Sequence, residues 1–155
     1  MFFVTGLPRS RTSWFSLYLD CEHEALNGLQ SKQEFYDLMP TIKGDSDCGL
    51  FLTDFQERWD APTVIIRRPV KEVYNSVLPL MDLPDDMLDI LHAVDSRLDD
   101  LRGLHVPFDE IDERLEEITN YLGEPYDEAR AVRYKAMRVE PMNVFGSINS
   151  VEVWL

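Results

Sequence analysis

The sequence begins with segments that predict a strand, a tight loop and a helix in immediate succession. Residues 1–5 are rich in Phe and Val, as expected of a strand buried on both faces in a parallel sheet. A Gly-Leu-Pro turn follows at residues 6–8, and residues 12–20 are apolar on nearly every side, which is typical of a helix packed inside a domain. Backbone N–H groups and the positive end of the helix dipole meet in such a loop. The sequence therefore predicts a phosphate-binding loop at residues 6–13.

The rest of the chain continues to alternate between strand and helix patterns. Further strands are expected at residues 40–43, within residues 60–69 and at residues 104–108, and helices at residues 31–39, 49–59, 70–81, 84–102 and 126–137. Asp109 is expected to N-cap one more helix, which Gly123 ends. This alternation predicts an α/β fold of three αβα layers and P-loop type, with a central parallel sheet, in a single domain spanning residues 1–155. Ligands then bind at the carboxyl ends of the strands.

The charge distribution limits the kinds of partner. The formal net charge is -14, and residues 82–128 hold 3 Lys or Arg against 16 Asp or Glu. Because a nucleic-acid-binding protein normally presents a basic surface, no nucleic-acid partner is expected. Signal-peptide features and long apolar runs are missing, which predicts a cytoplasmic protein without a membrane partner. Cys21 and Cys48 lack the spacing of a metal site, so no metal is expected.

The predicted loop carries cationic and hydroxyl side chains but departs from an ATPase loop. Arg9 and Arg11 add cationic donors, and Thr12 and Ser13 add hydroxyls. Against the pattern G-x-x-x-x-G-K-[ST], Arg11 stands at the second glycine and Thr12 at the lysine. The strand within residues 60–69 ends in two arginines rather than in an aspartate that would hold magnesium. These features favour a phosphorylated ligand other than Mg-ATP.

Two segments resemble the PAPS-dependent sulfotransferases. The first is the 5′-phosphosulfate loop, which in that family often reads G-x-P-R-S-G-T-[ST]-x. The matching residues here are Gly6, Pro8, Arg9, Ser10, Thr12, Ser13 and Trp14. Arg11 stands where the family has glycine, and the resemblance places it too at the phosphosulfate. The second is a strand ending in arginine, a helix led by proline and a serine two turns later, matched by Arg68 and Ser76, with Arg67 in a shifted register. Residues 106–111 and 121–123 resemble, more weakly, the family's late strand and helix.

The resemblance implies a donor, a reaction and a set of catalytic residues. The donor would be 3′-phosphoadenosine 5′-phosphosulfate (PAPS), and the reaction would transfer its sulfuryl group to a hydroxyl or amine of a small molecule or biopolymer. Arg9 matches the basic loop residue that stabilises leaving-group charge. Asp45 is a candidate general base with Lys43 as a contact to the sulfuryl oxygens, although Asp45 is equally compatible with a turn. His23 and Glu24 form the other candidate pair.

Two other functions fit parts of the sequence. A nucleotide or small-molecule kinase shares the strand–loop–helix beginning, although it needs the lysine that this loop lacks. A catalytically inactive nucleotide-binding or assembly protein would keep the loop without turnover. The sequence does not identify the acceptor or the oligomeric state.

Overall fold

The computed structural model describes residues 1–25, 31–47, 56, 58–80 and 82–137. Within these residues, one sheet of five parallel strands has the order β2-β3-β1-β4-β5. The strands are β1 (Phe3–Gly6), β2 (Glu22–His23), β3 (Asp45–Asp47), β4 (Thr63–Arg67) and β5 (Leu104–Pro107). The predicted parallel sheet is thus confirmed, and β1 lies at its centre with β3 and β4 on either side.

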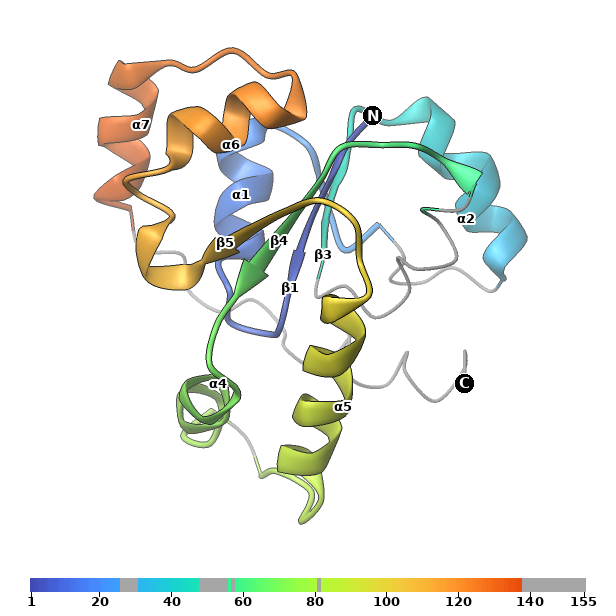
Figure 1. Ribbon diagram of the computed structural model, residues 1–155, viewed down its shortest axis with the longest axis vertical. Coiled ribbons are helices and arrows are strands. Elements are labelled where there is room, and N and C mark those ends of the chain that lie inside the picture. Colours follow the sequence, from blue (N-terminus) through green and yellow to red (C-terminus); the bar gives the residue numbers. More distant parts are fainter. Residues whose placement is uncertain (26–30, 48–55, 57, 81, 138–155) are drawn as a thin grey trace.

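Helices cover both faces of this sheet (Figure 1). On one face lie α1 (Thr12–Leu19), α6 (Leu115–Leu122) and α7 (Glu128–Lys135). The other face is covered by α2 (Lys32–Leu38), α4 (Val70–Val77) and α5 (Met87–Asp99). Two short 3-10 helices, η1 (Met39–Thr41) and η2 (Phe108–Glu110), lie between these elements. The three layers are those of the predicted αβα arrangement.

Strand alternation divides the buried side chains into two cores. Val4, Val64 and Ile66 pack with the α1, α6 and α7 face, whereas Phe3 and Ile65 pack with the α4 and α5 face. Successive side chains of a strand point to opposite faces, so a strand buried on both sides has apolar residues at every position. This explains why β1 and β4 were recognisable in the sequence. The same alternation determines toward which face of the sheet the last residue of each strand points.

Three sequence-based boundaries were wrong. Residues 39–41 form η1, and the strand expected at 40–43 lies instead at Asp45–Asp47. The helix expected from Asp109 begins at Leu115, with Asp109 inside η2. The helix after Pro69 ends at Val77 rather than near residue 81. Gly123 does end α6, with a left-handed φ of 76°. Most of the helix expected at 49–59 lies outside the described residues.

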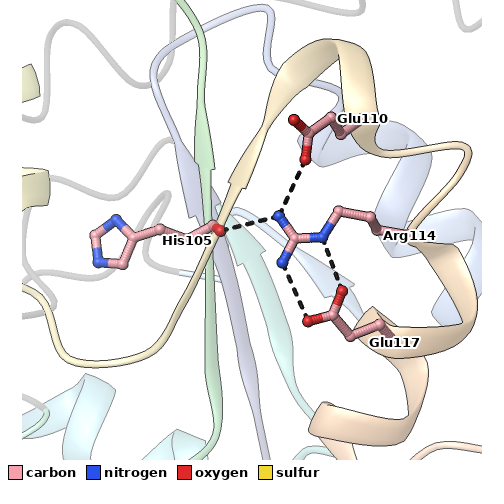
Figure 2. Close-up of polar contacts among 4 residues, drawn as sticks. All are labelled: His105, Glu110, Arg114 and Glu117. Carbon is pink, nitrogen blue, oxygen red and sulfur yellow. Dashed lines mark hydrogen bonds and ion pairs between the residues drawn. The ribbon is translucent and has the colours of Figure 1, made fainter.

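The delayed start of α6 follows from the contacts of Arg114 (Figure 2). Its Nε donates to Glu117 Oε2 at 2.8 Å, Nη2 donates to Glu117 Oε1 at 3.1 Å, and Nη1 donates to Glu110 Oε2 at 3.3 Å. Nη1 also lies 3.4 Å from the carbonyl oxygen of His105, whose ring points away from Arg114. Arg114 thereby joins β5, η2 and the first turn of α6. The connection from β5 to α6 is held beside the end of β4.

Candidate functional site

The loop between β1 and α1 lies at the carboxyl ends of the central strands. The Ser10 N–H donates to the Leu7 carbonyl at 3.2 Å, which closes a turn before α1 begins at Thr12. A Cβ on Gly6 would lie 2.8 Å from the carbonyl oxygen of Ile66 in β4. Glycine is therefore required at this position because the loop passes directly against β4. The predicted strand–loop–helix is confirmed in the position where parallel sheets bind ligands.

Two arginines of the loop adopt the left-handed conformation. The φ angles are 66° for Arg9 and 65° for Arg11. Glycine adopts this region without strain, whereas other residues do so at a cost of about 1 kcal/mol or more. The Arg11 guanidinium pairs with Asp112 at 2.8 Å and lies over the Trp14 ring at 4.5 Å from its centroid. Arg11 thus keeps the backbone conformation expected of glycine, while its side chain is held beside the connection from β5 to α6.

Arg68 joins the loop to the segment that follows β4. Its Nη1 donates to the Arg9 carbonyl at 2.6 Å, and its guanidinium lies 4.2 Å from the centroid of the Phe108 ring. The Arg9 Nε donates to Ser76 Oγ of α4 at 3.3 Å. Burial lowers the pKa of Arg68, the Glu72 carboxylate opposes that shift, and the nearby Arg9 charge adds to it. Two cationic side chains and a hydroxyl therefore converge where the loop meets α4.

Several buried polar atoms of this region are unpaired within the described chain. Ser10 Oγ, Thr5 Oγ1 and Arg68 Nε have no hydrogen-bond partner there, although Glu72 Oε2 lies 3.7 Å from Arg68 Nε. Ser10 and Thr5 are both 0% exposed. A buried polar atom without a partner costs about 1–3 kcal/mol, so native proteins rarely leave one unpaired without a functional reason. Three of the five such atoms in the described chain thus lie in or beside the loop, and the other two are Tyr18 Oη and Arg67 Nη1.

Arg67 and Arg68 have different partners. Arg67 Nη2 lies 3.0 Å from Asp95 and 2.8 Å from Asp99, both in α5. Strand alternation turns Arg67 toward this face together with Ile65, whereas Arg68 follows the strand and reaches the loop. Of the two alternatives that the sequence left open, only Arg68 is brought to the loop.

Trp14 belongs to the core rather than to an open surface. It is 3% exposed, stacks on Tyr18 with 5.0 Å between ring centroids, and donates its indole N–H to the Tyr134 carbonyl at 2.7 Å. The ring lies against Tyr18 and the Arg11 guanidinium, so it offers no free face to a base. Its role is to tie α1 to α7.

A hydrogen-bond chain runs from α1 to the neighbouring strands β2 and β3. Ser13 Oγ lies 2.8 Å from His23 Nε2, and His23 Nδ1 lies 2.6 Å from the Ser46 carbonyl oxygen. The Ser46 hydroxyl in turn donates to the Thr12 carbonyl at 2.7 Å. His23 ends β2 at the same edge of the sheet as the loop. Among the candidate catalytic residues, His23 contacts Ser13 of the loop directly.

The structure does not bring Lys43 and Asp45 to the loop. Lys43 Nζ donates to the carbonyl of Leu19, the last residue of α1, at 2.7 Å and pairs with Glu124 at 2.7 Å. An eight-residue helix is about 12 Å long, so Lys43 lies near the end of α1 that is far from the loop. Asp45 begins β3, is 2% exposed and accepts the Ala25 N–H at 3.1 Å.

The acidic residues of β3 and of the segment after β2 lie at different places along the strands. Burial, with a contribution from Asp47, raises the pKa of Asp45 well above its usual value, which disfavours the charged form. Glu24 follows β2 with a left-handed φ of 53°. Asp47 ends β3 and is aligned with Thr5 of β1. The sequence prediction missed Asp47 because it placed the third strand at residues 40–43.

Two further properties concern the whole described chain. None of its helices combines the length and apolarity needed to cross a membrane. The described residues also contain no cluster of three or more His, Cys, Asp or Glu side chains with the geometry of a metal site.

Among the comparisons with known proteins, the one with solved structures supports the fold. Searches against models of known protein families and against curated protein sequences give no match. Among solved structures, the chain is similar to the mouse sulfotransferase SULT7A1 complexed with PAP, with a TM-score of 0.55 and 14% sequence identity. The similarity covers 86% of this chain and 61% of the mouse protein. The chain therefore has a sulfotransferase-like α/β fold, and at this identity the likeness concerns the fold alone.

Proposed function

We propose that this protein binds PAPS and its product 3′-phosphoadenosine 5′-phosphate (PAP) at the loop, and transfers the sulfuryl group to a hydroxyl or amine acceptor. The loop from Gly6 to Ser13 would hold the 5′-phosphate, and Arg68 with Ser76 would hold the 3′-phosphate. The similar mouse structure contains PAP, which supports a bisphosphorylated nucleotide as the ligand class. PAPS supplies an activated sulfuryl group when it is bound.

The observation that carries this proposal is the convergence of Arg9, Arg68 and Ser76. Arg68 reaches the Arg9 carbonyl at 2.6 Å, and the Arg9 Nε reaches Ser76 at 3.3 Å. Two guanidinium groups repel one another, and the Arg9 charge contributes to the lowered pKa of Arg68. An anion placed between them would remove this repulsion and use the unpaired Arg68 Nε. A ligand with two phosphate groups suits a loop and an adjacent arginine pair.

Catalytic roles follow from the position of each side chain. Arg9, in the loop, stabilises negative charge that develops on the departing phosphate oxygen. The Nε2 lone pair of His23 already accepts the Ser13 hydroxyl, so His23 is a poor proton acceptor for a substrate in this arrangement. Glu24 follows β2 at the same edge, and we assign it the proton of the acceptor hydroxyl or amine. Lys43 and Asp45 have no part in this assignment.

A metal-dependent phosphotransferase is the second candidate, and Asp47 is the observation that favours it. Asp47 stands at the carboxyl end of the strand beside β1, where a carboxylate could hold magnesium near a loop-bound phosphate. The loop has Thr12 where a Mg-ATP enzyme has its phosphate-binding lysine. The nucleotide preference therefore separates the two functions.

The test is calorimetric titration with PAP and, separately, with Mg-ATP. We expect micromolar binding of PAP, no heat from Mg-ATP, and at least about 100-fold weaker PAP binding in Arg68→Ala, because charge-assisted contacts to a phosphate are lost. Arg97→Ala, which removes an exposed arginine of α5, is the matched control and should bind as the unaltered protein does. Binding of Mg-ATP alone would identify a kinase, and unchanged PAP affinity in Arg68→Ala would contradict the proposed site.

A further inference from the structure

The direction of the hydrogen bonds around His23 is fixed by its partner in β3. The Ser46 carbonyl oxygen, 2.6 Å from Nδ1, can only accept, so Nδ1 carries the proton. In a neutral imidazole Nε2 then has a lone pair and accepts from the Ser13 hydroxyl, 2.8 Å away. The Ser13 proton therefore points at His23. The oxygen of Ser13 offers only lone pairs to anything else in the first turn of α1.

With its proton directed at His23, the Ser13 hydroxyl cannot donate a hydrogen bond to an anion in the loop. Ser13 lies in the first turn of α1, where free N–H groups and the helix dipole attract negative charge. A phosphate there would meet the Ser13 lone pairs instead of its proton. If His23 takes a second proton, Nε2–H donates to Ser13, and the Ser13 hydroxyl becomes free to donate to the phosphate.

We propose that His23 takes up a proton when the loop binds a phosphate group, and that this proton reverses the Ser13 hydroxyl from a donor toward His23 into a donor toward the ligand. The inference rests on the proposed nucleotide site and adds to it a proton linkage. His23 acts through Ser13, so it is a positioning residue. The proton comes from solvent, and no covalent bond changes.

The charges near His23 favour such a linkage. The His23 ring and the Ser46 hydroxyl both bond to residues of α1, so they share one face of the sheet, and strand alternation turns Glu22 of β2 and Asp45 and Asp47 of β3 to the other face. Glu24 follows β2 with a left-handed φ of 53°. The α1 segment Thr12–Leu19 contains no charged side chain, and Arg11 before it is paired with Asp112. An imidazolium on this face would be stabilised chiefly by an anion bound in the loop.

The linkage is measured by PAP titration calorimetry at pH 7.5 in two buffers of different ionisation enthalpy, which counts the protons taken up on binding. We expect the unaltered protein to take up at least about half a proton more per nucleotide than His23→Gln, because a glutamine amide cannot take up the proton. Proton uptake by the nucleotide itself is common to both proteins and cancels. His92→Gln, on the exposed face of α5, is the matched control and should keep the extra uptake.

Nitrogen-15 NMR of the histidine rings gives the same answer without a substitution. The chain has three histidines, and PAP should convert His23 alone from the neutral Nδ1–H form to the imidazolium.

Ser13→Ala, which removes the hydroxyl, should reduce the extra proton uptake. PAP binding with equal proton uptake in the unaltered protein and His23→Gln, or with a neutral His23 ring in the complex, would overturn the linkage and leave the nucleotide site standing. Absence of PAP binding in every protein would refute the proposed function itself.

Discussion

The two edges of the sheet differ in how their polar groups are paired. At the carboxyl edge, Ser10 Oγ and Arg68 Nε are buried without hydrogen-bond partners in the described chain. At the amino edge, the Gln56 side chain accepts the Arg102 N–H at 2.9 Å and donates to the Arg102 carbonyl at 2.5 Å, while Arg102 Nη2 donates to the Gln56 carbonyl at 2.8 Å. Lys43 at that edge is likewise paired with Glu124. The Gln56, Arg102 and Lys43 groups at the amino edge are thus paired, whereas Ser10 Oγ and Arg68 Nε at the carboxyl edge are not.

One cavity of the described chain lies away from the proposed nucleotide site. A cavity of about 230 Å³ lies at the amino edge, lined by Gln56, Trp59, Asp60, Ala61, Pro62, Arg102, Gly103 and Tyr121. The loop and Arg68 lie at the opposite edge. Unpaired buried donors next to cationic side chains point to a ligand more directly than empty volume does. We therefore expect substitutions at the amino edge to change stability and those at the carboxyl edge to change binding.

The largest effect is expected from Gly103→Ala at the amino edge. Gly103 has a φ of 154°, and a Cβ there would overlap the carbonyl oxygen of Thr63 at the start of β4. The variant should lose about 3 kcal/mol of unfolding free energy, measured by urea denaturation, because both backbone strain and overlap oppose the native state. Gly123→Ala, with a φ of 76° and open space around it, should lose only about 1 kcal/mol. Equal losses in the two variants would show that the Thr63 contact is unimportant.

A smaller effect, dependent on pH, is expected from Asp45→Asn. Burial raises the Asp45 pKa in the folded protein, so the native state holds a proton that the unfolded chain releases as the pH rises above about 4. Asp45 therefore costs progressively more stability between pH 4 and neutral pH, and asparagine removes that cost while still accepting the Ala25 N–H.

The comparison of interest is the difference in melting temperature between the variant and the unaltered protein. That difference should be near zero at pH 4 and should increase in favour of Asp45→Asn toward pH 8. Asp82→Asn makes the same charge change on an exposed side chain and should show no such trend. A difference that does not vary with pH would mean that Asp45 is charged in the folded protein.

The smallest effect is expected from Ser76→Ala at the carboxyl edge. The substitution removes the hydroxyl that accepts from Arg9 Nε at 3.3 Å, and PAP affinity should fall about fivefold, or about 1 kcal/mol. Unfolding free energy should not change measurably. Ser96→Ala, on α5, should leave both quantities unchanged. A loss of stability without a loss of affinity in Ser76→Ala would contradict the expectation that substitutions at the carboxyl edge change binding rather than stability.

The parts of this molecule that sequence reasoning recovered are those with strong local signals. The strand before Gly6 and the β-branched strand before Arg67 are apolar at consecutive positions, so their burial in a parallel sheet could be predicted. The loop was predicted from its place between a strand and a helix. Arg11 could not be interpreted from sequence, because its left-handed φ and its pairing with Asp112 depend on a segment far along the chain.

Other features were missed for physical reasons. The strand Asp45–Asp47 reads Asp-Ser-Asp and has no apolar pattern. Its buried side chains bond to backbone groups: the Asp45 carboxyl accepts the Ala25 N–H, and the Ser46 hydroxyl donates to the Thr12 carbonyl. Because the strand was expected at residues 40–43, Asp47 was not recognised as the residue at its carboxyl end. The Ser13–His23 contact joins residues ten apart, but its meaning depends on the Ser46 carbonyl, which sequence alone does not place.

The bond from the Trp14 indole to the Tyr134 carbonyl has a consequence for synthesis of the chain. The partners are 120 residues apart, and Arg130 also donates to the Leu17 carbonyl of α1 at 3.1 Å. The loop leaves the ribosome before α7 does, so the helix behind it gains its last covering only when α7 has emerged. A nascent chain halted before residue 128 would expose the Trp14 and Tyr18 rings to water and to chaperones. The covering of α1 is therefore completed only after the loop and the strands of the sheet have been synthesised.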